Sequence, residues 1–172
     1  MDIITSLHGN RIGLSKNDDL VINEQIAIPA VNGKVVALTA ATTITRDSHD
    51  ARILYLNAAA GKAITLPAAS GSGSRYRFIL GTTVTSIGHT IKVANATDIM
   101  IGNALVLQDG GDTLVAFETA SDTDTITLNG TTTGGIKGDE IEVIDVASGV
   151  FFVKLLLSAT GTEATPFSAT VS

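Results

Sequence analysis

Cysteine and tryptophan are both absent from this 172-residue chain, and only 4% of its residues are aromatic. Without cysteine the chain has no disulfide, no thiolate metal ligand and no thiol nucleophile, which fits a protein made in a reducing cytoplasm. Charged residues are also scarce, at 16% against about 25% in an average globular domain. Because few charges keep the copies apart and 44% of the residues are hydrophobic, we expect a homo-oligomer or a subunit of a larger assembly.

Other absences exclude further classes of partner. No run of 18 apolar residues occurs, so the sequence predicts no membrane-spanning helix. The net charge is −6 and no basic stripe is present, which argues against nucleic-acid binding. The first residues, MDIITSLHGNR, lack the basic start and apolar core of a secretion signal.

Short runs rich in β-branched residues fill most of the chain, whereas helical periodicity is nearly absent. Turn residues separate these runs at the spacing of an all-β sandwich or barrel. Apolar and polar residues alternate within them, which gives one buried and one wet face and favours antiparallel pairing. The sequence therefore predicts an antiparallel β-sandwich or barrel, with a jelly roll possible. The expected strands lie within residues 35–46, 51–58, 62–68, 75–84, 89–95, 104–108, 113–119, 124–130, 139–146 and 149–158.

The first 32 residues differ from the rest and predict an extended N-terminal arm, followed by a single β-domain over residues 33–172 that ends in a short tail, GTEATPFSATVS. Apolar pieces in the arm are too short to repay the entropy of their own ordering, so we expect them to dock on the body, a sister subunit or another protein. The expected partner contacts are Leu7, His8, Arg11, Ile12, Leu14, Leu20, Ile22, Ile26 and Ile28.

The glycine-rich stretch NGTTTGGIKGD invites comparison with a phosphate-binding loop. Gly130 and Gly135 have the required spacing, but Lys137 is preceded by Ile136 and followed by Gly138 instead of Ser or Thr. The residues after it alternate like a strand, so no helix N-terminus is available to hold a phosphate. We therefore expect no nucleotide here, and a hairpin with a glycine-rich connection.

Acidic and histidine residues offer no catalytic or metal-binding pattern. Calcium binding at the acidic clusters would need a closing glutamate that is missing, so their residues are interpreted as turn formers. Histidines are far apart in the sequence and match no zinc motif, and Glu140 and Glu142 fit a solvated strand face. We expect no catalytic residue, cofactor or metal. The acidic clusters hold Asp109, Asp112, Asp122 and Asp124, and the histidines are His8, His49 and His89.

Three segments, residues 63–86, 90–102 and 124–153, together with the GTEATPFS tail, resemble small virion proteins of tailed bacteriophages, namely capsid decoration (cement) or head-fibre-like proteins. The resemblance implies a non-enzymatic homo-oligomer, commonly a trimer, that is synthesised in the host cytoplasm and binds the major capsid protein on the outside of the virion. The alternative is a fibre, spike or head-fibre adhesion module that binds host-surface glycans. Sugar-binding faces usually carry aromatic platforms, and the chain offers only Tyr55 and Tyr76 beside its phenylalanines.

Overall fold

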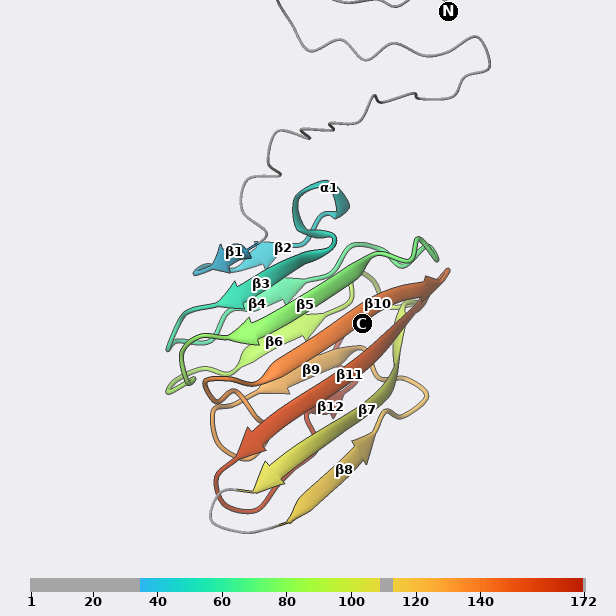
Figure 1. The fold of residues 1–172 in the computed structure, drawn as a ribbon. Coiled ribbons are helices and arrows are strands. Elements are labelled where there is room, and N and C mark those ends of the chain that lie inside the picture. The colour runs from blue at the N-terminus through green and yellow to red at the C-terminus, as the bar shows by residue number, and fades with distance from the viewer. Residues whose placement is uncertain (1–34, 109–112, 172) are drawn as a thin grey trace, which may run out of the picture. The chain divides into compact units, whose positions relative to one another are not determined.

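A computed structural model describes residues 35–108 and 113–171 as an all-β body of two stacked sheets (Figure 1). This confirms the predicted fold class. The arm, with all nine of its expected partner contacts, and the acidic residues Asp109 and Asp112 lie outside the described residues. In the part of the chain that is described, no helix is long and apolar enough to cross a membrane.

The larger sheet has seven strands, in the order β1-β3-β5-β10-β11-β7-β8, and the smaller has five, in the order β12-β9-β6-β4-β2. The first predicted strand region forms two short strands, one in each sheet, and a single helical turn, α1 (Arg46–His49), follows at its end. The strands of the larger sheet are β1 (Val35–Leu38), β3 (Arg52–Leu56), β5 (Arg75–Leu80), β7 (Ile99–Gln108), β8 (Leu114–Glu118), β10 (Glu140–Ala147) and β11 (Val150–Ala159). Those of the smaller sheet are β2 (Thr42–Thr43), β4 (Ala63–Thr65), β6 (His89–Lys92), β9 (Thr125–Leu128) and β12 (Phe167–Ser168).

Pairing is mixed, which corrects the expectation of a purely antiparallel sandwich. Strands β1, β3 and β5 are parallel neighbours in one sheet, and β2, β4 and β6 are parallel neighbours in the other. The chain therefore crosses from sheet to sheet and returns beside its previous strand, in three successive coils. Parallel pairing normally needs a crossover connection, usually a helix. Here a strand of the opposite sheet takes the place of that helix.

The second half of the body follows the antiparallel expectation more closely. Antiparallel pairs join β5 to β10, β10 to β11 and β7 to β8, and also β6 to β9 and β9 to β12. One long parallel pair, β7 with β11, lies among them. Apolar–polar alternation identified which residues face inward, but it carries no information about strand direction.

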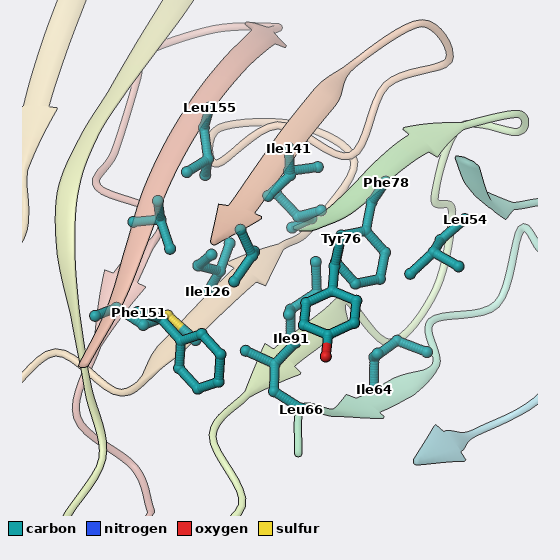
Figure 2. Close-up of a cluster of buried hydrophobic side chains, with 14 of the residues drawn as sticks. Leu54, Ile64, Leu66, Tyr76, Phe78, Ile91, Ile126, Ile141, Phe151 and Leu155 are labelled. Atoms are coloured by element: carbon teal, nitrogen blue, oxygen red, sulfur yellow. The ribbon is translucent and has the colours of Figure 1, made fainter. Parts of the chain in front are cut away.

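The core lies between the two sheets and is built from the inward side chains of both (Figure 2). One inward row of the larger sheet runs through Leu54, Phe78, Ile141 and Leu155, which are paired in register and essentially fully buried. Each large apolar side chain buried in this way contributes roughly 1.5–3 kcal/mol. Tyr76 is also fully buried, and its hydroxyl has no hydrogen-bond partner among the described residues.

Two segments that the sequence predicts as a hairpin and a tail form part of the sandwich. The glycine-rich stretch joins β9 in the smaller sheet to β10 in the larger, so it crosses between the sheets and is not a hairpin. Gly130 has φ of 80°, and a Cβ there would stand 1.9 Å from the Val84 carbonyl oxygen, so this crossing requires glycine. Near the C-terminus, Phe167 is 8% exposed and pairs with Ile126, so this part of the tail belongs to the core.

Candidate interaction surface

Asp145 is the most heavily hydrogen-bonded carboxylate of the described residues. It lies on the inward side of β10, in the same phase as Ile141 and Val143, and is 1% exposed. Its oxygens accept backbone N–H groups of Ser70 at 3.0 Å, Gly71 at 2.7 Å and Ser72 at 3.1 Å. They also accept the hydroxyls of Ser72 at 2.6 Å and Ser70 at 3.1 Å. The loop of residues 70–74, SGSGS, is therefore held around one carboxylate by its own N–H and hydroxyl groups.

These contacts also determine the charge state of Asp145. Burial by itself would raise the pKa of the carboxyl group, but hydrogen bonds from Ser72, Gly71 and Ser70 outweigh it and lower the pKa from 3.8 to about 2. Arg46, half-exposed, adds a cation at 3.7 Å from Oδ2. Asp145 is therefore ionised at neutral pH, and its lone pairs are already used by the protein's own loop.

Asp139 fixes the glycine-rich crossing in the same manner. It is 2% exposed, and its carboxylate accepts N–H groups of Gly135 at 2.8 Å and Ile136 at 3.0 Å on one oxygen. The other oxygen accepts the N–H of Ser158 at 2.8 Å. Amide groups that would cradle a phosphate in a nucleotide-binding loop are here directed at an internal carboxylate.

Asp124 and Asp98 complete the set of buried carboxylates. Asp124 accepts the N–H groups of Thr170 at 2.8 Å and Val171 at 3.0 Å, which holds the C-terminal residues against β9. Asp98 accepts the N–H of Ala69 at 2.9 Å. Of the acidic residues predicted to form turns, Asp122 lies in an exposed turn, whereas Asp124 is buried and anchors the chain end.

The two described histidines are structural. His49 Nδ1 accepts the backbone N–H of Thr45 at 3.0 Å across the single turn of α1. His89 is fully buried, its Nδ1 accepts the N–H of Lys62 at 2.9 Å, and burial lowers the pKa of its ring. Between residues 35 and 171, the gap at 109–112 apart, no three His, Asp or Glu side chains gather where they could hold a metal ion.

Two shallow grooves are present, and neither gathers catalytic groups. The larger, of about 420 Å³, lies where edge strands β8 and β12 approach, between Phe117 and Phe167. Glu118 and Asp122 are the only ionisable residues of its described lining. The smaller groove, of about 340 Å³, has no ionisable side chain in its described lining, which includes Leu107 and Ile136.

The outward side of the seven-stranded sheet, called the outer face below, carries large apolar side chains in contact with solvent. Along it Leu156 is 49% exposed, Leu107 47%, Leu114 55% and Ile101 43%. Strand register arranges the outward residues in rows. One row runs across six strands through Tyr55, Ile79, Glu140, Leu156, Leu105 and Ala116. Another contains Ile144, Phe152 and Ile101, which are half-buried or exposed.

A charged row lies between these two rows and alternates in sign. Neighbouring strands place Arg77, Glu142 and Lys154 side by side, and Glu118 follows beyond Asn103. Arg77 also donates two hydrogen bonds to Glu140, at 2.7 and 2.9 Å, and these lower the pKa of that carboxyl group. Such exposed ion pairs contribute little to the stability of the fold, but they fix the positions of the charged side chains on the outer face.

Glu140 and Glu142 stand half-exposed on this face, which confirms the predicted solvated strand face. The sequence analysis missed the outer face as a whole and the role of Asp145. A signal for Asp145 was present, because it continues the inward phase of Ile141 and Val143 along one strand. A carboxylate in that phase must be hydrogen-bonded internally.

Comparisons of this chain with protein-family models, with curated proteins and with solved structures give no match.

Proposed function

We propose that this protein is a non-enzymatic structural subunit of a tailed-bacteriophage virion, a decoration protein that binds the outer surface of the major capsid protein lattice. The observation that carries the proposal is the outer face, whose rows of solvent-exposed leucine and isoleucine fit a subunit of a larger assembly, while the N-terminal arm is proposed to contact the capsid lattice. Contiguous apolar surface of this kind marks contact with another protein surface. Its breadth suits such a surface better than it suits a small molecule, which requires a concave site.

The buried polar groups support the same conclusion. Asp145, Asp139, Asp124 and Asp98 each accept hydrogen bonds from backbone amides of the chain itself. Groups engaged in this way hold loops in place and are poorly suited to proton transfer or metal binding. In a capsid-binding subunit, firmly held loops would keep the contact surface in one conformation. Modest contacts that are repeated over a lattice then give high avidity.

The test is reconstitution on capsids that lack this protein. Purified full-length protein is mixed with such capsids, pelleted with them, and its occupancy is measured together with the melting temperature of the head. We expect saturable binding and a higher melting temperature of the head. Failure to bind at micromolar concentration would contradict the proposal, and binding of the same protein to a host-glycan array would favour the fibre or spike adhesion module instead.

A further inference from the structure

The outer face is uncovered by any other described part of the chain, and its pattern suits a copy of itself. We propose that two copies of this protein pair through their outer faces, around a two-fold axis that lies between the faces and runs parallel to the strands, between β10 and β11. This pairing goes beyond the capsid role and does not depend on it.

The face is large enough for a stable pair. Strands lie about 4.8 Å apart and rise about 3.3 Å per residue, so each residue covers roughly 16 Å² of a sheet. The seven strands together hold about 50 residues and so offer roughly 800 Å². Standard stable interfaces bury about 800 Å² on each partner.

Charge on the face favours a second copy over a partner of opposite charge. Its strand residues include three cations, Arg75, Arg77 and Lys154, and three anions, Glu118, Glu140 and Glu142. The face is therefore neutral, and the rest of the chain carries the whole net charge of −6. A neutral face that carries both signs can set its cations against the anions of an equivalent face, whereas a strongly acidic or basic partner gains no net attraction from it.

Strand register then determines which residues meet. An axis parallel to the strands between β10 and β11 sets β10 over β11 of the other copy, and β5 over β7. Glu142 of each copy then lies over Lys154 of the other, which makes two symmetric ion pairs. In the apolar rows, Ile144 lies over Phe152 and Ile79 lies over Leu105. Two aligned sheets pack face to face in this way in β-sandwiches.

This arrangement predicts a dimer, in contrast to the trimer that the phage resemblance implies. Light scattering coupled to size exclusion, on the purified full-length chain without capsids, distinguishes the two. We expect a mass twice the 17.6 kDa of the chain at high micromolar concentration. A monomer or a trimer would overturn the pairing, and neither result depends on whether the protein binds capsids.

Two sets of variants locate the interface. Leu156→Glu adds a carboxylate beside Glu140 of both copies, and we expect at least a tenfold higher dissociation constant. Ile87→Glu is the matched control, because Ile87 is 81% exposed but lies outside both sheets, and it should leave the dissociation constant unchanged. Circular dichroism establishes that each variant is folded. Equal effects of the two variants would overturn the proposed location.

Charge reversal tests the register and does not rely on an apolar substitution. Glu142→Lys alone sets two cations over each other, and Lys154→Glu alone sets two anions over each other. We expect each to weaken pairing about tenfold, and the double variant to return to within about threefold of the original dissociation constant. A double variant as weak as the single variants would overturn the register.

Discussion

Asp145 illustrates how one buried side chain can determine the conformation of a loop far away in sequence. The loop it holds, residues 70–74, is made of serine and glycine, which have little conformational preference of their own. Five donor groups of that loop, three N–H groups and two hydroxyls, reach the carboxylate. A neutral amide of the same shape can accept at only one of its two positions, so it would leave several loop donors without partners.

Asp145→Asn should therefore destabilise the folded protein. The pKa of about 2 in the folded state, against an ordinary value of 3.8, corresponds to roughly 2 kcal/mol of stability at neutral pH. Because the folded pKa is lowered, this contribution is present above about pH 4 and is lost as the pH falls toward 2. Urea unfolding at pH 7 should show the loss.

The pH dependence provides the control for this prediction. At pH 3 the difference between Asp145→Asn and the original protein should be smaller than at pH 7. Asp122→Asn, at an exposed turn, should change the free energy of unfolding by less than about 0.5 kcal/mol. An Asp145→Asn protein as stable as the original at pH 7 would mean that the loop does not depend on the carboxylate.

At the scale of the elements, the sequence predicted the positions of the strands better than it predicted which strands pair. Alternation separates Leu54 and Leu56 from Ile53 and Tyr55 along residues 51–58, and the structure buries the leucine pair. Whether two neighbouring strands pair parallel or antiparallel depends on the path of the chain between them. A connection that runs through the opposite sheet leaves no signature in the local apolar–polar periodicity. β12 was missed for a related reason, because two residues are too few to show a period, and Phe167 is held by its partner strand.

The N-terminal arm is the element for which the structure sharpens a prediction. The buried core of the described residues extends from Leu38 to Phe167, so the described body has a continuous core of its own. Deletion of Met1–Asn32 should leave the β-signal in circular dichroism intact. If the arm provides the capsid contact, the same deletion should abolish attachment to capsids that lack this protein, measured by sedimentation.

Two results would contradict that expectation in different ways. Full occupancy of capsids by the truncated protein would show that the body alone makes the contact. Loss of the β-signal would show that the arm belongs to the core. A protein with Leu20 and Ile26 changed to serine at full length provides the matched control, because it removes apolar contacts without shortening the chain.

In the described body as a whole, the seven-stranded sheet is covered by the other sheet on its inner side only. Its outer face is formally neutral, and the net charge of −6 belongs to the rest of the chain, where the buried Asp98, Asp124, Asp139 and Asp145 account for four of the negative charges. Its described contributions to stability are the core between the sheets and the hydrogen bonds that the buried carboxylates accept.

Indifference to metal chelation is the consequence that can be measured on the whole molecule. Asp124 uses its oxygens for Thr170 and Val171, and Asp139 uses its own for Gly135, Ile136 and Ser158, so a cation would have to displace these bonds to bind. We expect the melting temperature in excess EDTA to stay within about one degree of its value in added calcium. EDTA preloaded with calcium controls for the chelator itself. A ligand that binds only the folded state raises stability by mass action. A fall of ten degrees or so in EDTA, reversed by calcium, would therefore show that these acidic residues hold a metal.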